Sequence, residues 1–369
     1  MNTAIRARRA RLRLLYEGKD ISEDISKDLI SATWTDKSAK EVDDLSITLH
    51  NKHGRWYGEW LPSKGAKLSA WIVVENWAHA SDGYALPCGT FEIDEIEVSS
   101  PPSTVTVKAV SMPITAQARG QAKNRAWEDV TLKRIAADIA AEAGLDLIYD
   151  KDDDPFYQYE GQHEETDLSF LQGLCAESGA SLKVTHDKIV VFDQAKREEM
   201  PPVVEITPER LTSHRLRSKS SQVYSSCKVQ YHDPETNEEY EYEHKGNLAN
   251  LSGKDRNGRV LFANKRCKSL AEAENLARNI LWDSNKFEVS GSITTMGDIR
   301  LNAGVNIRLF GFGRFDGKYM IESATHNIGN GYTTSAEIRR ILDRGKSRKA
   351  EEQDVAWQDF DEYGEDFYK

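Results

Sequence analysis

The side chains that could bind a metal ion are few and widely spaced along the chain. His50 and His53 flank a turn, and two imidazoles at this spacing could bind a transition metal, but no third ligand lies near them in the sequence. The acidic run at 150–155 has the composition of a calcium-binding loop. An EF-hand loop needs glycine at its sixth position and glutamate at its twelfth, and these positions hold Pro155 and Gly161. We therefore predict no metal site and no cofactor.

Motifs for phosphate binding and for nucleophilic catalysis are also missing. The stretch GFGRFDG at 311–317 resembles a nucleotide-binding loop, but Asp316 stands where the third glycine is needed. Because it lies between two predicted strands, we predict a hairpin turn there. No G-x-S-x-G, H-E-x-x-H or Walker sequence occurs. No pair of carboxylates stands out for glycan cleavage, so a cell-wall hydrolase is the less favoured alternative to a non-enzymatic, structural protein.

Composition narrows the class of protein further. The 369 residues include 60 acidic and 49 basic ones, and the net charge of −11 argues against a basic surface that wraps nucleic acid. Four cysteines are too few for a disulfide scaffold, and we predict buried thiols at Cys88, Cys175, Cys227 and Cys267. No run approaches eighteen apolar residues, so no membrane span is expected. The N-terminal residues lack the apolar segment of a secretory signal, which predicts a cytoplasmic protein.

Alternating apolar and polar residues predict a first β unit over residues 11–113, after a basic arm over residues 1–10. The expected strands lie near 29–35, 45–50, 67–76, 90–98 and 104–112. Turn-rich pieces without helices separate them, which is typical of a sandwich or barrel. Trp56 and Trp60 stand on either side of a tight loop and are candidates for contact with a partner.

Helical spacing of apolar residues predicts a small α+β module over residues 114–204. A first helix is expected to begin near Trp127, with the acidic pair Glu128-Asp129 at its N-terminal end, and to end at Gly144. A second helix is expected over 167–178, with Thr166 as its N-cap and Gly179 as its stop, and a hairpin follows it.

A second β unit is predicted in two pieces, over residues 205–232 and 286–343. The insertion at 233–285 contains a helix at 269–284, whose first residues Ser269 and Glu272 form a capping box. We expect this insertion to pack on the α+β module.

Residues 344–369 form a predicted acidic, aromatic C-terminal tail. Its last nineteen residues carry eight acidic side chains and one lysine. Aromatic residues are unusual in a purely solvated tail, and their presence is typical of a segment that becomes ordered on a partner. An unfolded acidic terminus is the alternative. The candidate contact residues are Trp357, Phe360, Tyr363, Phe367 and Tyr368.

Three stretches of the chain resemble the phage late control D family, the baseplate hub of contractile tails, which is similar to the hub part of valine-glycine-repeat spike proteins. They cover residues 16–60, 164–193 and 297–340. The third stretch is the most specific, because it holds the family's structural signature in order: Gly297, Gly304, Gly311, Gly313, Gly317, Tyr319, His326, Gly331, Tyr332, Thr333 and Glu337.

The resemblance implies a mainly β fold with an α+β insertion, in which two tail-tube-like β-barrels per chain are joined by the small α+β module. It implies a homotrimer with pseudo-sixfold symmetry that adapts the hexameric tail tube to the trimeric central spike. Strands of neighbouring barrels would pair or abut to continue the tube. The implied partners are the tail tube protein, a separate central spike protein, baseplate wedge proteins and the tape measure protein.

The implied location is the tail baseplate of the virion, with the host cytoplasm during assembly. The equivalent hub of a tailocin or another contractile injection system is the alternative. DNA would pass through the channel without specific binding. The net charge of −11 predicts an acidic channel wall that repels the phosphate backbone.

Overall fold

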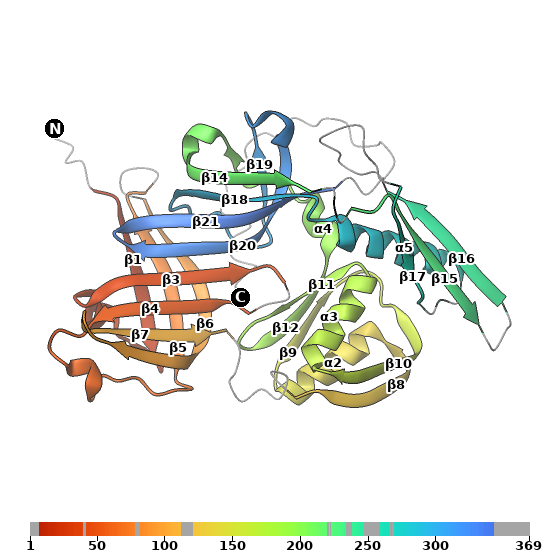
Figure 1. The fold of residues 1–369 in the computed structure, drawn as a ribbon. Helices are drawn as coiled ribbons and strands as arrows, with labels where there is room; N and C mark the ends of the chain where they lie inside the picture. Colours follow the sequence, from red (N-terminus) through yellow and green to blue (C-terminus); the bar gives the residue numbers. More distant parts are fainter. Residues whose placement is uncertain are drawn as a thin grey trace.

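The computed structural model describes residues 7–39, 42–77, 82–111, 121–219, 221, 223–233, 238–246, 258–265, 267 and 269–342. Over these residues the protein is mainly β, with one 13-stranded sheet, two three-stranded sheets and one two-stranded sheet (Figure 1). In the same residues no helix combines the length and the apolar character needed to cross a membrane.

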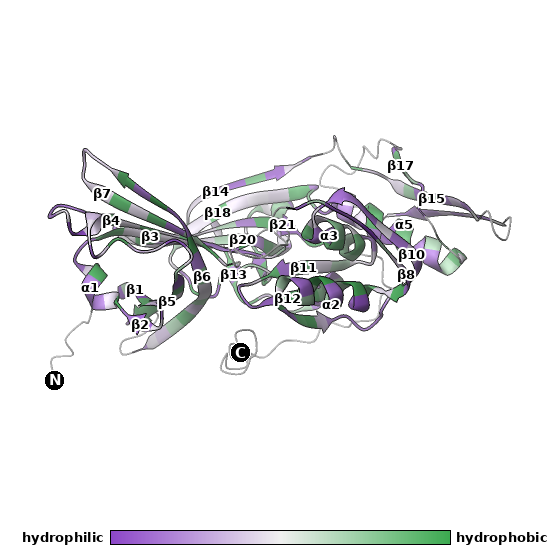
Figure 2. Cartoon of the chain, turned by 90° about the horizontal axis from the view of Figure 1, so that it is seen from below, coloured by the Kyte–Doolittle hydropathy of each residue, from purple (hydrophilic) through white to green (hydrophobic). Residues whose placement is uncertain are grey.

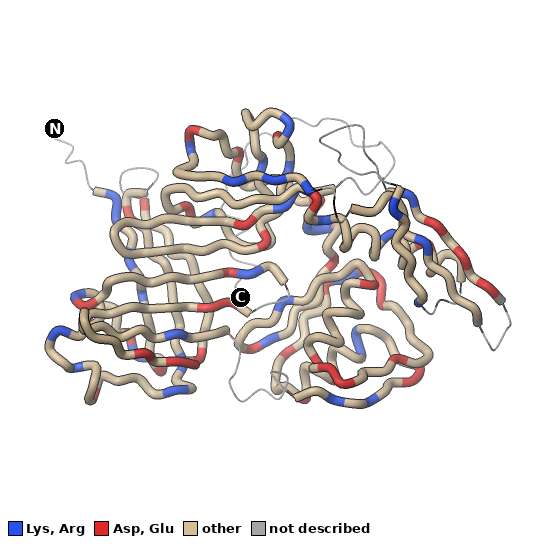
Figure 3. Tube along the Cα trace, viewed as in Figure 1, with Lys and Arg blue, Asp and Glu red and all other residues tan. Residues whose placement is uncertain are grey.

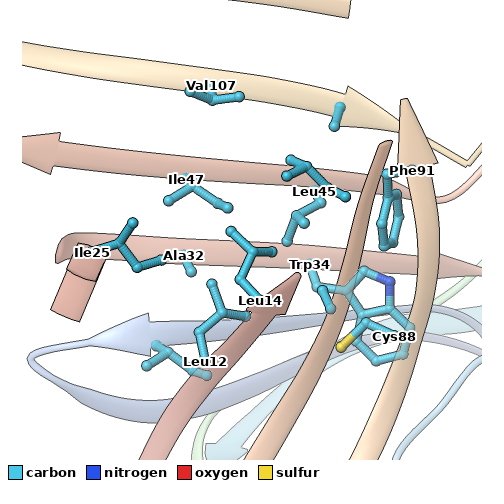
Figure 4. Packing of buried hydrophobic residues seen from close by; sticks show 14 of the residues in the cluster. Leu12, Leu14, Ile25, Ala32, Trp34, Leu45, Ile47, Cys88, Phe91 and Val107 are labelled. Carbon is cyan, nitrogen blue, oxygen red and sulfur yellow. The ribbon is translucent and has the colours of Figure 1, made fainter. Parts of the chain in front are cut away.

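The first β unit is a bent antiparallel sheet folded over its own core. Its elements are β1 Arg9–Tyr16, β2 Lys19–Asp20, α1 Ser22–Ser26, β3 Leu29–Lys37, β4 Asp44–His50, the 3-10 turn Arg55–Tyr57, β5 Lys67–Glu75, β6 Gly83–Ser99 and β7 Thr104–Val110. β6 pairs with β5 over its first half, up to Glu92, and with β7 over its second half. Its register with β7 shifts between Ile93 and Glu95. The bend brings β1 and β5 over β3, β4 and β7, and the core lies between these layers (Figure 4).

The second β unit is built from strands on both sides of a long insertion. Its elements are β13 Glu205–Ile206, the 3-10 turn Pro208–Arg210, β14 Leu211–Ser218, β18 Val289–Met296, β19 Asn306–Leu309, the 3-10 turn Gly313–Phe315, β20 Gly317–Gly329 and β21 Gly331–Arg340. β19 and β20 pair antiparallel, which confirms the hairpin turn predicted at 311–317. Apolar residues alternate with polar ones along these strands (Figure 2), and the buried set includes Ile293, Ile307 and Ile338.

The two β units share one sheet, because β3 pairs antiparallel with β20 over residues 32–37 and 323–328. The strand order is β14-β18-β21-β20-β3-β4-β7-β6-β5-β1-β2. The expected pair of barrels is therefore corrected to two curled units in a single open sheet, and among the described strands neither unit closes. The physical reason is that β3 and β20 satisfy their edge hydrogen bonds against each other.

The α+β module follows the first unit in sequence. It consists of β8 Lys123–Thr131, α2 Leu132–Ala143, β9 Asp146–Asp150, β10 Phe156–Glu165, α3 Asp167–Glu177, β11 Ala180–Val184, β12 Lys188–Asp193 and α4 Gln194–Glu199. The Thr166 cap is confirmed, since its hydroxyl accepts the Ser169 N–H, and Gly144 ends α2 with a positive φ of 69°.

The start predicted for the first helix is wrong. α2 begins at Leu132, capped by Thr131, whereas Trp127 and the pair Glu128-Asp129 lie in β8. β8 pairs with β10, and the Trp127 ring stacks on Phe170 of α3 at 5.2 Å. This packing and the strand hydrogen bonds therefore decide the conformation at these residues.

The insertion forms a blade of its own, with β15 Ser226–Asp233, β16 Glu238–Lys245, β17 Val260–Ala263 and α5 Leu270–Asn285. Residues 226–232 were expected in the second β unit, but they pair with β16 and β17. The reason is apolar matching, because Cys227 and Val229 pack against Ala273 and Ala277 of α5. α5 also contacts the α+β module, as predicted: the Asn279 amide donates to the Glu177 carbonyl at 3.0 Å.

Candidate assembly site: the seam between the two β units

The antiparallel pair of β3 and β20, here called the seam, is backed by a buried aromatic cluster that contains two of the signature residues. The His326 ring stacks on Trp34 of β3 with centroids 5.1 Å apart. Its Nε2 lies 3.1 Å from the Leu301 carbonyl, which can only accept, so Nε2 carries the proton. Nδ1 then accepts the Tyr332 hydroxyl at 2.7 Å. Burial lowers the pKa of His326 to about 4, so the imidazole is neutral at pH 7.

The signature glycines have two separate explanations. Gly297 lies so close to the Tyr332 ring that a Cβ would come within 2.0 Å of it, and its carbonyl accepts the Trp77 indole N–H at 2.6 Å. The other five adopt positive φ at turns or strand ends, which glycine does without steric cost; they are Gly304, Gly311, Gly313, Gly317 and Gly331. These positions build the second β unit and its joint with the first.

The remaining signature residues divide between the core and the surface. Tyr319 is buried in the second core, and its hydroxyl donates to the Phe315 carbonyl at 2.7 Å. Thr333 and Glu337 are exposed on β21. Tyr319 therefore stabilises the turn after β19, whereas the side chains of Thr333 and Glu337 form part of the exposed surface of the sheet.

A half-buried lysine ties the α+β module to the seam. Lys183 of β11 lies 2.6 Å from Asp36 and 3.4 Å from Asp43, and Asp36 also accepts the Ala303 N–H at 2.8 Å. Burial raises the pKa of Asp43 to about 6. Burial disfavours the charged lysine, yet the two carboxylates raise its pKa to about 12. One charged cluster thus connects three parts of the chain.

A second buried cluster surrounds Arg339 of β21, which is fully buried. Its guanidinium pairs with Glu198 of α4 at 2.7 Å and with Glu322 of β20. It also lies over the Trp282 ring of α5, 5.1 Å from the centroid. The second β unit, the α+β module and the insertion therefore meet at one side chain. The spacing of residues in the sequence contains no signal for this cluster.

The large sheet carries short hydroxyl side chains on the face opposite its core, here called the polar face. The Thr294 and Ser335 hydroxyls lie 3.0 Å apart, and Thr35 is opposite Thr325 across the seam. By register and burial this face includes Ser292, Thr294, Ser335, Thr325, Thr33, Thr35, Ser46, Thr48 and Thr106. Charged residues are sparse along the middle of these strands (Figure 3).

The structure separates the two predicted contact tryptophans. Trp56 is only 4% exposed, and its indole N–H donates to Asp28 at 3.2 Å, so it packs as a core residue of the first β unit. Trp60 is partly buried edge-on against it at 5.7 Å and keeps an accessible side. Trp357, Phe360, Tyr363, Phe367 and Tyr368 lie outside the described residues, as do most residues of the basic arm.

The residues singled out for metal or thiol chemistry do not form a site. Within the described ranges, no three His, Cys, Asp or Glu side chains come together as metal ligands, His50 and His53 included. All four cysteines are free and buried, as predicted.

Residues 95–332 match the family described as phage tail baseplate hub (GPD), and because this is more than half of the chain, the chain belongs to that family. It is 32% identical over 182 residues to the probable baseplate hub protein of Escherichia phage P2. It is 30% identical over 181 residues to the corresponding protein of Escherichia phage 186. Each match covers 48% of this chain but only 43% of the relative, so it spans less than half of the relative's length.

Solved structures of tail proteins share the fold. The 43 kDa tail protein of prophage MuSo2 from Shewanella oneidensis aligns with a TM-score of 0.67 at 14% identity, over 90% of this chain and 98% of that one. A tail protein from Neisseria meningitidis MC58 gives 0.66 at 12% identity, over 90% and 96%. A component of the type VI secretion system of E. coli gives 0.53 at 14% identity, over 93% and 79%.

Proposed function

We propose that this chain is the structural hub of a contractile tail baseplate, a homotrimer that adapts a hexameric tail tube to a trimeric central spike. The observation that carries this proposal is the seam, through which each copy presents two β units in one sheet. Three copies around an axis would present six units, giving pseudo-sixfold symmetry toward the tube and threefold symmetry toward the spike. Membership of the baseplate hub family and the tail-protein fold support this role.

The polar face is the proposed wall of the channel through which DNA and the tape measure protein pass. Hydroxyl groups predominate on the middle strands of this face, and its cations are Lys108 of β7, which pairs with Glu95 at 3.0 Å, and Arg215 and Arg217 of the edge strand β14. Because the middle strands offer few cations to the phosphate backbone, few counter-ions would be released on contact and DNA would not adhere. The net charge of the chain is not evidence for an acidic channel wall, because seven of the eleven excess negative charges lie in residues 351–369. A wall of mainly neutral hydroxyl groups therefore replaces the expected acidic wall in our proposal.

The proposed partners are the tail tube protein, the central spike protein, baseplate wedge proteins and the tape measure protein, in the virion tail after assembly in the host cytoplasm. The acidic, aromatic residues 351–369 are the proposed contact with the spike or another baseplate protein. Deleting them should leave the number of copies in the hub unchanged and abolish capture of that partner. Capture at wild-type strength by the shortened chain would refute the contact.

Native mass measured by light scattering tests the hub itself. We expect a value near three times 41.7 kDa for the chain alone, or that value plus the mass of the bound spike after co-expression with the spike protein of the same tail. A chain that stays at 41.7 kDa under both conditions would contradict the tube-adaptor mechanism.

The hub of a tailocin or another contractile injection system is the second candidate, favoured by the fold shared with the type VI secretion component. Capsid genes beside the coding gene would indicate a phage, and a tail cluster without capsid genes would indicate an injection machine.

A further inference from the structure

The α+β module contacts both β units, and the two contacts differ in kind. On the side of the second unit, α4 is anchored by buried polar groups. The Asn306 amide donates to the carbonyls of Arg197 and Met200, each at 2.7 Å, and Glu198 pairs with Arg339. The side chains of Asn306, Glu198 and Arg339 are all buried. This side of the module is therefore fixed to the second unit.

On the side of the first unit the contact is made by charged and titratable side chains, here called the ionic contact. It consists of Lys183 of β11 with Asp36 and Asp43, and of His186 in the turn after β11 with Glu92 of β6. Figure 1 shows β11 and β12 next to the ends of β3 and β4, where Asp36 and Asp43 lie. The module therefore reaches the first unit mainly through charges.

Apolar packing across the ionic contact is slight. Among the described residues of the first unit, only Val42 packs against the hydrophobic core of the module. The His186 Nδ1 atom is buried, lies 3.9 Å from the Glu92 carboxylate and has no hydrogen-bond partner among the described residues. A buried polar atom without a partner indicates a contact that is not fully closed. Small polar interfaces of this kind permit relative movement of the parts they join.

The two β units are joined to each other at the seam, and the ionic contact acts there. Among the described strands, β3 and β20 are the one pair that connects the units, over six residue pairs. Strand pairing fixes register but tolerates twist angles of about 10 to 35° between neighbours. Asp36 lies opposite Ala324 in this pair, and its second carboxylate oxygen accepts the Ala303 N–H at 2.8 Å. Lys183 therefore holds the module against both sides of the seam.

The chemistry of the ionic contact allows it to open and close again. Charged groups recover their hydration when they separate, and this recovery offsets most of the lost attraction. Separated apolar faces have no such compensation. A partner that binds one of the two arrangements more tightly would select it.

We propose that the α+β module is a releasable brace that sets the angle between the two β units. α4 is its fixed end and the ionic contact is its releasable end. When the ionic contact is closed, the angle is held. When it is open, the shared sheet bends at the seam while β3 and β20 stay paired. This inference concerns a single chain and goes beyond the proposed hub, in which the brace would set how the six units meet.

Distances between spin labels, measured by double electron–electron resonance, test the brace. Cysteines for labelling replace one exposed residue in each part: Glu97 in the first unit, Asp152 in the module and Arg308 in the second unit, whose side chains are 58%, 81% and 61% exposed. The four native cysteines are buried. Labelled chains are diluted with unlabelled chains, so that only distances within one chain are measured.

The variant Lys183→Met removes the cation of the releasable end. For the label pairs 97–152 and 97–308 we expect a second distance, with a population at least about tenfold above that of the wild type. The pair 152–308 should keep its distance, because α4 remains anchored. Lys183→Arg retains the cation and should keep the wild-type distances for all three pairs.

Asp43→Asn is a milder second variant, because its amide oxygen can still accept the Lys37 N–H that Asp43 accepts at 2.8 Å. It should shift the same two distances in the same direction to a smaller extent. Unchanged distances in both variants would overturn the brace. A change that includes the pair 152–308 would also overturn it, since the whole chain would then have loosened. Native mass, which tests the hub, has no bearing on these distances.

Discussion

The close approach of Gly297 to the Tyr332 ring makes this glycine a packing requirement at the residue scale. In Gly297→Ala the added methyl would overlap the ring, so the seam cluster must shift, and we expect a loss of about 1–3 kcal/mol in the free energy of unfolding. Urea unfolding measures this loss. The matched control is Gly173→Ala inside α3, where a Cβ meets no atom within 4 Å and the helix should gain about 0.5–1 kcal/mol. Equal stabilities for the two variants would contradict the crowding argument.

The buried neutral His326 predicts a pH dependence of stability. Its pKa falls from 6.5 to about 4 on folding, so its contribution is complete above pH 6.5 and decreases as the pH falls toward 4. The loss should reach about 3 kcal/mol at the acid end of this window. Asp43 acts in the opposite direction, because its pKa rises from 3.8 to about 6 and the folded chain takes up that proton first.

The variant His326→Gln separates these two groups. Glutamine does not titrate, so the variant should lose less stability than the wild type between pH 7 and pH 4.5, as measured by urea unfolding at each pH. Parallel pH curves for the two proteins would show that His326 does not control this dependence.

At the scale of elements, Arg339 is the point where β20, β21, α4 and α5 are held together. Arg339→Met would leave the carboxylates of Glu198 and Glu322 facing each other without their buried cation. We expect a loss of about 3–5 kcal/mol in the free energy of unfolding. Differential scanning calorimetry of the variant would measure it.

A triple variant distinguishes charge from shape at this position. Adding Glu198→Gln and Glu322→Gln to Arg339→Met removes the two carboxylate charges that the arginine neutralised, so much of the lost stability should return. The exposed control Arg134→Met should change stability by about 0.5 kcal/mol or less. If the triple variant is no more stable than Arg339→Met, lost packing rather than lost charge explains the effect.

At the scale of the whole molecule, the polar face makes a prediction about DNA passage. Thr35 and Thr325 face each other across the seam. Changing both to arginine would place cations on the proposed channel wall, so DNA release from particles should slow and should recover as salt increases. Particles with glutamine at both positions have a similar steric change without charge. Equal release rates for the arginine and glutamine particles would remove the polar face from the channel.

Local chemistry by itself determined most of the elements of this protein. Alternation of apolar and polar residues placed β3, β4, β5 and β7 close to their observed bounds. The sequence also predicted the N-cap at Thr166, the helix end at Gly144 and the hairpin turn at 311–317, because caps and turns depend on a few adjacent residues. The signature positions of the third stretch indicated the family, which the match over residues 95–332 confirms.

Tertiary structure alone decided how these elements combine. Alternation indicates which face of a strand is buried, but the backbone hydrogen bonds at its edges are the same for every residue type. The sequence therefore could not show that β3 pairs with β20 nearly three hundred residues away, or that β15 joins the blade. Likewise, the net charge of the chain does not show where its charged residues lie. Only the folded structure showed that hydroxyl groups predominate on the outer face of the sheet and that Arg339 is buried between two carboxylates.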